Sequence, residues 1–250
     1  MLGLASLLPG SLTARADENA TGEKLLPKDT LLFVTIPDVE GMKDQWDKSL
    51  SGAMLQEPAL KPFLEDIQKK IDELSGKLMD EIGVTIPDLL AIPNGEITFA
   101  LMERPAKKLS VVLMVDYGES TETIDKLLKQ MHEALDGGVA EHSTEDINDV
   151  AVHIYTMKDG NPDNPFKTLA YFNDESYLVF SSEVDALKEV LDRWDGDSDD
   201  TLAGNDVFKY IQDKCKDEAG EAVIKWYFNP IGLVEAGVNQ RSEEHTAEQQ

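Results

Sequence analysis

The chain has few of the residues that usually reveal a function. Its one cysteine, Cys215, excludes an internal disulfide, so its stability depends on the burial of apolar side chains. Cys215 is in helical register with Phe208 and Ile211, which predicts a small buried side chain rather than a nucleophile.

Basic residues are also scarce. The 250 residues include 23 Lys and Arg against 49 Asp and Glu, a formal net charge of -26 at pH 7. Nucleic acids and anionic membrane surfaces require clustered cations, so we expect neither as a partner. The acids are spread along the whole chain, which favours a solvated coat over a localised surface for cations or a basic partner.

No hydrophobic run approaches the roughly 20 residues of a transmembrane helix, and we expect no integral membrane span. The apolar run from Leu2 to Leu8 is followed by Ala14-Arg15-Ala16, a small-x-small cleavage pattern directly before Asp17. This arrangement predicts a signal peptide at residues 1–16, although Arg15 is the first cation and the usual basic start is missing. The expected location is therefore the periplasm or the cell exterior.

Common catalytic motifs are missing as well. The sequence has no G-x-S-x-G elbow, H-E-x-x-H helix, glycine-rich phosphate loop or C-x-x-C pair. Four histidines are too far apart in sequence for a local metal motif, so we expect each to be solvated or in the core: His132, His142, His153 and His245. Carboxylates are so numerous that no acid–base pair stands out, and the sequence predicts no catalytic residue.

Apolar periodicity predicts both strands and helices. The predicted strands are residues 31–36, 96–102, 109–115, 150–157, 168–172, 177–181 and 223–228. The predicted helices are residues 39–50, 60–78, 124–135, 184–194 and 206–214, and we expect the apolar stripe of the 60–78 helix to be packed. Hairpins with helices between them indicate an α+β fold, a mostly antiparallel sheet of about six strands with amphipathic helices packed on one face.

The end of the chain repeats the pattern of its beginning. Strand 31–36 is stopped by Pro37 and followed by a helical pattern, and strand 223–228 is followed by Pro230 and another helical pattern. We therefore expect residues 17–220 to form an α+β domain. Residues 221–250 are expected to start a second repeat unit and to end in the polar tail 241–250.

Residues 195–206 have the outline of a calcium-binding loop between two predicted helices. Acidic residues occupy positions 1, 3, 5 and 12 of this twelve-residue segment: Asp195, Asp197, Asp199 and Asp206. Ca²⁺ needs several oxygen ligands, which alternating aspartates supply. Position 6, however, is Asp200 where a sharp turn needs Gly, and position 12 is Asp rather than Glu. The alternative is a solvated connector in which Asn205 or Asp206 caps the next helix.

Two tryptophans fall within predicted apolar faces. Trp194 is in the stripe of the 184–194 helix, and Trp226 is inside the strand 223–228. This placement predicts core packing for both, in preference to a shared surface that stacks on sugars.

Several short segments carry a resemblance to a known family. They are Leu26-Pro27-Lys28-Asp29-Thr30-Leu31-Leu32-Phe33-Val34-Thr35-Ile36-Pro37-Asp38, then residues 56–63, 93–96 and 198–203, and they span most of residues 25–238. These segments resemble an uncharacterised family of exported bacterial proteins, described as a domain of unknown function. The resemblance implies export, supports this fold and carries over no catalytic residue. It also implies that related chains often continue further, and it argues against the calcium loop.

Together these observations predict an exported, non-catalytic binding or assembly protein with an unknown protein or cell-envelope partner. The alternatives are an exported hydrolase with carboxylate catalysis and a calcium-stabilised structural domain. An enzyme should have a concave pocket with converging polar groups and a carboxylate of raised pKa. An assembly protein should have an exposed apolar patch or sheet edge.

Overall fold

The computed structural model describes residues 21–49, 54, 57–82, 85–87, 92–104, 109–158, 167–196, 198–215 and 222–236. The expected signal peptide at residues 1–16 and the polar tail 241–250 lie outside the described residues. Within the described residues, no helix is long and apolar enough to cross a bilayer.

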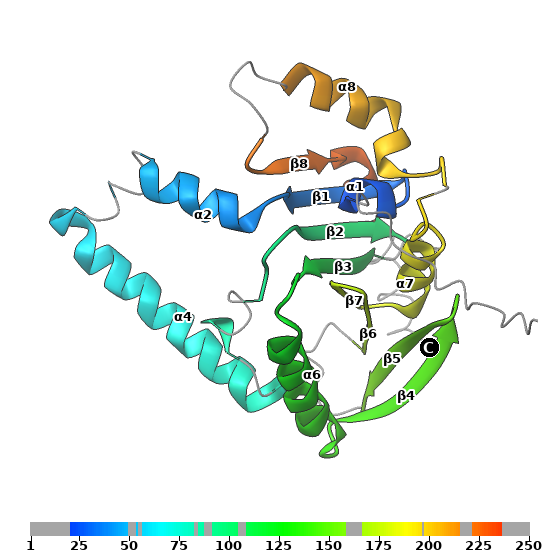
Figure 1. The fold of residues 1–250 in the computed structure, drawn as a ribbon, viewed down its shortest axis with the longest axis horizontal. Coiled ribbons are helices and arrows are strands. Elements are labelled where there is room, and N and C mark those ends of the chain that lie inside the picture. The colour runs from blue at the N-terminus through cyan, green and yellow to red at the C-terminus, as the bar shows by residue number, and fades with distance from the viewer. Residues whose placement is uncertain are drawn as a thin grey trace, which may run out of the picture.

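Eight strands form one antiparallel sheet in the described part of the chain (Figure 1). They are β1 (Thr30–Ile36), β2 (Ile97–Glu103), β3 (Leu109–Asp116), β4 (Ala140–Ile147), β5 (Val150–Met157), β6 (Thr168–Asp174), β7 (Tyr177–Ser181) and β8 (Lys225–Phe228). Their order in the sheet is β4-β5-β6-β7-β3-β2-β1-β8. The expected α+β class is confirmed, with eight strands in place of about six.

The helices follow or connect these strands. The α-helices of the described residues include α1 (Gly22–Leu25), α2 (Val39–Lys48), α4 (Lys61–Ile82), α6 (Thr121–Asp136), α7 (Val184–Leu191) and α8 (Asp206–Cys215). Short 3-10 helices among the described residues are η1 (Pro58–Leu60) and η3 (Leu202–Gly204). Each longer helix coincides with a helical pattern in the sequence.

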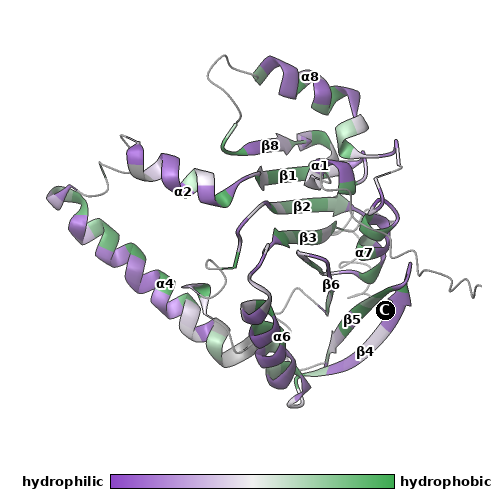
Figure 2. Ribbon diagram, in the orientation of Figure 1, coloured by the Kyte–Doolittle hydropathy of each residue, from purple (hydrophilic) through white to green (hydrophobic). Residues whose placement is uncertain are grey.

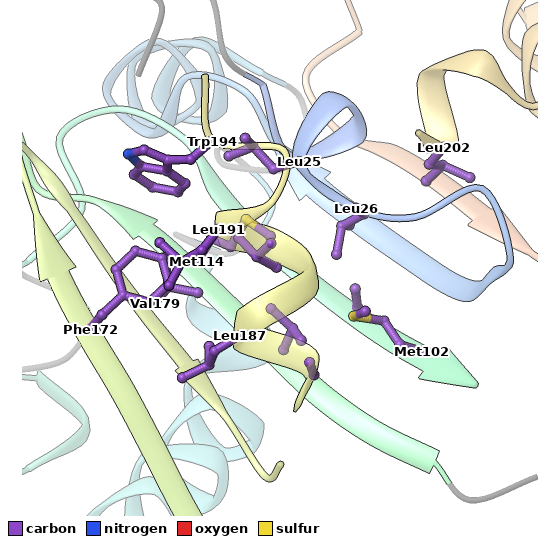
Figure 3. Packing of buried hydrophobic residues seen from close by; sticks show 14 of the residues in the cluster. Leu25, Leu26, Met102, Met114, Phe172, Val179, Leu187, Leu191, Trp194 and Leu202 are labelled. Atoms are coloured by element: carbon purple, nitrogen blue, oxygen red, sulfur yellow. The ribbon is translucent and has the colours of Figure 1, made fainter. Parts of the chain in front are cut away.

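Buried side chains form a separate hydrophobic cluster on each face of the sheet. Successive residues of β3 point to opposite faces, so Met114 joins the first cluster and Val115 the second. Helix α7 covers the first face, where Leu187 and Leu191 of α7, the following Trp194 and Phe172 of β6 belong to one buried cluster (Figure 3). Helix α6 covers part of the second face. The expectation that helices pack on one face only was therefore wrong, because both faces of the central strands are apolar.

Strand β4 was not among the predicted strands. Only its two end residues, Ala140 and Ile147, are buried, so it has no apolar alternation, and Figure 2 shows it mostly hydrophilic beside the apolar β5. It pairs with β5 along its whole length. Asn148 and Asp149 connect the two strands, both with positive φ, 54° and 64°. Asn and Asp tolerate this conformation, which matches the twist of a two-residue hairpin.

Helix α4 has the expected helical structure but not the expected packing. Figure 1 shows it extending beyond the sheet, and it contacts α6. Its apolar residues include Phe63, 59% exposed, and Leu74, 52% exposed. The apolar stripe predicted a buried face because periodicity cannot show whether a partner surface is within reach. Cys215, at the end of α8, is likewise exposed and not buried as expected.

Strand β8 lies in the segment that was expected to begin a second repeat unit. It is at the edge of the same sheet and pairs antiparallel with β1. The similarity between the two ends of the chain includes the turns that follow β1 and β8. The Asp38 carboxylate accepts a hydrogen bond from Gly41 N at 2.8 Å, and the Asn229 amide oxygen accepts one from Gly232 N at 3.1 Å. The repeat and the division at residue 221 remain predictions.

Candidate functional site

The loop that resembled a calcium site is attached to the segment before β1. Leu202 N donates to Leu26 O at 2.8 Å, and Asn205 Nδ2 donates to Lys28 O at 2.8 Å. Asn205 also accepts hydrogen bonds from the first amides of α8, as the alternative interpretation of this loop expected. The loop therefore holds α8 against the start of the sheet.

The structure describes three of the four calcium candidates. Asp195 and Asp199 are exposed loop residues, Asp206 is the first residue of α8, and Asp197 lies outside the described residues. Among the residues that are described, no three His, Cys, Asp or Glu side chains are grouped so that they would hold an ion. The calcium site remains a prediction.

Asp200, at position 6 of this loop, has partners of its own. Its carboxylate lies 2.7 Å from Lys28 Nζ and 3.5 Å from Arg193 Nη2. The hydrogen bond from Lys28, together with its charge, holds the pKa of the Asp200 carboxyl below its ordinary value. Arg193 Nε also donates to the backbone oxygen of Asp200 at 2.8 Å.

A cavity of about 350 Å³ adjoins this ion-paired group. Its lining is Pro27, Lys28, Asp29, Glu189, Asp192, Arg193, Ser198 and Asp200. The cations that reach it are already paired with Asp200, and the pKa of that carboxyl is lowered rather than raised. The ion pairs of Asp200 join the loop to Lys28 and Arg193. A carboxyl that acts as a general acid needs a raised pKa instead.

Three histidines that are distant in sequence meet on the second face of the sheet. His132 is on α6, His142 on β4 and His153 on β5. The ring centroids of His132 and His142 are 5.0 Å apart, and those of His142 and His153 are 5.4 Å apart. His142 Nε2 lies 3.2 Å from His153 Nδ1. Strand pairing therefore brings together histidines that are too far apart in sequence to form a local motif.

Two tyrosines complete this group, which we call the histidine cluster: His132, His142, His153, Tyr155 and Tyr171. The Tyr155 hydroxyl lies 2.8 Å from His132 Nδ1. The ring of Tyr155 stacks on that of His142, and the ring of Tyr171 stacks on that of His153. Burial lowers the pKa of both His142 and His153, and the neighbouring imidazoles lower it further.

A second feature is an exposed apolar surface at the other end of the same sheet face. Trp226 is 66% exposed and Phe228 47% exposed. Each pairs directly with a residue of β1, Val34 and Leu32 respectively. These four side chains and two residues of β2 form what we call the Trp226 face: Leu32, Val34, Phe99, Leu101, Trp226 and Phe228.

The prediction of core packing is confirmed for Trp194 and wrong for Trp226. Trp194 is buried, 2% exposed, and its Nε1 donates to Asp174 at 3.0 Å. Trp226 was expected in the core as well, but β8 is an edge strand and its alternate residues point to opposite faces. Tyr227 joins the buried cluster of the first face, so its neighbour Trp226 must point away from it.

Comparison of this chain with models of known families, with curated proteins and with solved structures gave no match. The resemblance to exported bacterial proteins therefore remains a prediction.

Proposed function

We propose that this chain is an exported, non-catalytic binding or assembly protein that contacts its partner through the Trp226 face. The supporting observation is the exposure of Trp226 and Phe228 beside the apolar side chains of β1 with which they pair. Large apolar groups gathered on one exposed sheet face are typical of protein interaction sites. Tryptophan in particular contributes strongly to binding when it is buried by a partner.

The surroundings of this face suggest the nature of the partner. Its six side chains are apolar or aromatic, and β2 ends in Glu103, at the next position after Leu101 on the same strand face. We propose an apolar or aromatic segment of a protein or cell-envelope component. The net charge of -26 makes nucleic acid a poor partner.

The proposed location follows from the predicted export, which is based on the sequence alone. The apolar run and the Ala14-Arg15-Ala16 pattern place the mature chain in the periplasm or outside the cell in this proposal. The rival function, a hydrolase with carboxylate catalysis, is less well supported because the ion-paired carboxyl in the described cavity has a lowered pKa.

Site-specific photocrosslinking tests the proposed face. A benzophenone amino acid is placed at position 226 and, in a matched control, at Trp46, which is 49% exposed on α2. We expect an adduct of discrete mass from position 226 in the exported fraction and none from position 46. Self-adducts would identify assembly between copies. Equal labelling at both positions, or none at 226, would contradict the proposal.

A double variant, Trp226→Ser with Phe228→Ser, provides a second test in the same cells. The expected result is loss of the adduct formed by a probe at Val34, which pairs with Trp226. Far-UV circular dichroism of the purified variant checks that the sheet is retained. An unchanged adduct in a folded variant would exclude this face as the contact.

A further inference from the structure

The histidine cluster brings three metal-ligating side chains to one place from three separate elements. His142 and His153 are diagonal neighbours on paired strands, since His142 is opposite Tyr155 and His153 is opposite Thr144. His132 reaches them from α6, with its ring centroid 5.0 Å from that of His142. We propose that His132, His142 and His153 form a binding site for one divalent transition-metal ion such as Zn²⁺, Ni²⁺ or Cu²⁺.

The spacing of two ring nitrogens carries the first step of the argument. A zinc ion binds imidazole nitrogen at about 2.0–2.1 Å with tetrahedral angles, so two such nitrogens on one ion lie about 3.3 Å apart. His142 Nε2 and His153 Nδ1 are 3.2 Å apart. In the absence of metal, one nitrogen donates its hydrogen to the other. Metal binding requires that this hydrogen move to the outward ring nitrogen of the same imidazole, which is a change of tautomer.

His132 supplies the third ligand through its free nitrogen. Tyr155, whose side chain is fully buried, holds His132 Nδ1 with its hydroxyl at 2.8 Å and leaves Nε2 available. Such a bond to the second ring nitrogen is how proteins orient metal-binding histidines. In the described residues no three ligating side chains already converge on one point, so in this proposal ion binding requires side-chain rotations within the cluster.

The charges around the cluster favour a cation of this class. Only neutral imidazole binds a metal, so Zn²⁺ and protons compete for these rings. The charge of Asp136, on α6, acts on His142 and attracts a cation. Imidazole ligands suit zinc, copper and nickel, whereas calcium and magnesium prefer oxygen. The site is therefore distinct from the acidic loop at residues 195–206.

Calorimetric titration of the full chain after chelator treatment tests the proposal. We expect one Zn²⁺ per chain, no equivalent heat from Mg²⁺ at the same ionic strength, and at least tenfold weaker Zn²⁺ binding in His153→Gln. His245→Gln is the matched control because it removes a histidine outside the three elements of the cluster, and its affinity should equal that of the unmodified chain. Equal Zn²⁺ affinity in His153→Gln and the unmodified chain would overturn the proposal.

A second measurement uses the unmodified chain, so its result does not depend on whether a variant folds. The imidazole ring signals in the NMR spectrum of the unmodified chain are followed as Zn²⁺ is added. Saturable shifts in the signals of His132, His142 and His153 at one equivalent support the site. Shifts confined to His245, or shifts of equal size with Mg²⁺, would contradict it.

Discussion

The Thr35 hydroxyl donates a hydrogen bond of 2.6 Å to the Glu96 carboxylate, which is buried just before β2. Thr98 donates to the same carboxylate at 2.8 Å, and Gly22 N lies 3.2 and 3.1 Å from its two oxygens. This one acidic side chain therefore joins α1 to the paired strands β1 and β2. A buried carboxylate is tolerated here because its oxygens accept several hydrogen bonds.

Glu96→Ala should lower the free energy of unfolding by about 1.5–3 kcal/mol, because three donors lose a charged acceptor. Urea denaturation followed by circular dichroism measures this change. The control is Glu73→Ala on the exposed side of α4, which we expect to change stability by less than about 0.5 kcal/mol. Equal effects of the two substitutions would show that the buried contacts of Glu96 do not stabilise the fold.

Trp194 and Trp46 offer a contrast within one residue type. Trp194 packs edge-on against Phe172 and Tyr177, whereas Trp46 is half exposed on α2. Trp194→Ala should cost about 3–5 kcal/mol through loss of buried area and creation of a cavity. Trp46→Ala should change the free energy of unfolding little, and thermal melting of the two variants compares them directly.

The two amphipathic helices α7 and α4 should respond differently to truncation of their apolar side chains. Leu187→Ala on α7 removes a side chain that is fully buried in the core and should cost about 2–5 kcal/mol. Phe63→Ala on α4 removes a larger but exposed side chain and should cost less than about 0.5 kcal/mol. A large loss in Phe63→Ala would mean that the α4 stripe is covered in solution.

The Lys28–Asp200 ion pair predicts a specific pH dependence. The pKa of Asp200 is lowered from 3.8, so the unfolded chain binds its proton at a higher pH than the folded chain does. The stability from this pair is therefore complete above about pH 4 and is lost as the pH falls through the lowered value. The melting temperature of Asp200→Asn should lie slightly below that of the unmodified chain at pH 6, and the difference should shrink as the pH falls below 3.8. A constant difference would contradict the assignment.

Calcium should act on the acidic loop no more strongly than magnesium. The Asp200 carboxylate is already paired with Lys28 and Arg193, and the loop is held by hydrogen bonds to residues 26–28. We expect equal melting temperatures in the two ions at matched ionic strength, and the same result in Asp195→Asn. A rise specific to calcium that Asp195→Asn abolishes would instead support a calcium-stabilised domain.

Periodicity was sufficient for the elements with a buried face. The stripe of Val184, Leu187 and Leu191 predicts α7 because a buried helix must repeat its apolar residues every three or four positions. Strand β4 has no such constraint, since an edge strand contributes few side chains to the core. Its best local signal was Asn148-Asp149, two residues that favour the positive φ of a hairpin turn.

The candidate sites were harder to predict because they depend on register. His142 and His153 are eleven residues apart, and only the pairing of β4 with β5 makes them neighbours. Trp226 appeared buried because an apolar strand has the same composition at the edge and in the centre of a sheet. Its exposure follows from the position of β8 beside β1, which local sequence does not encode.

The pairing of β8 with β1 also affects the order in which the strands of the sheet form during folding. Val34 and Trp226 are opposite one another in the sheet although nearly two hundred residues separate them in the chain. Contacts of such long sequence separation form late, because a large loop must close first. Until residues 225–228 arrive, β1 has an open row of backbone donors and acceptors that another chain can pair with. During synthesis that open edge has to be protected by the cell rather than by the protein.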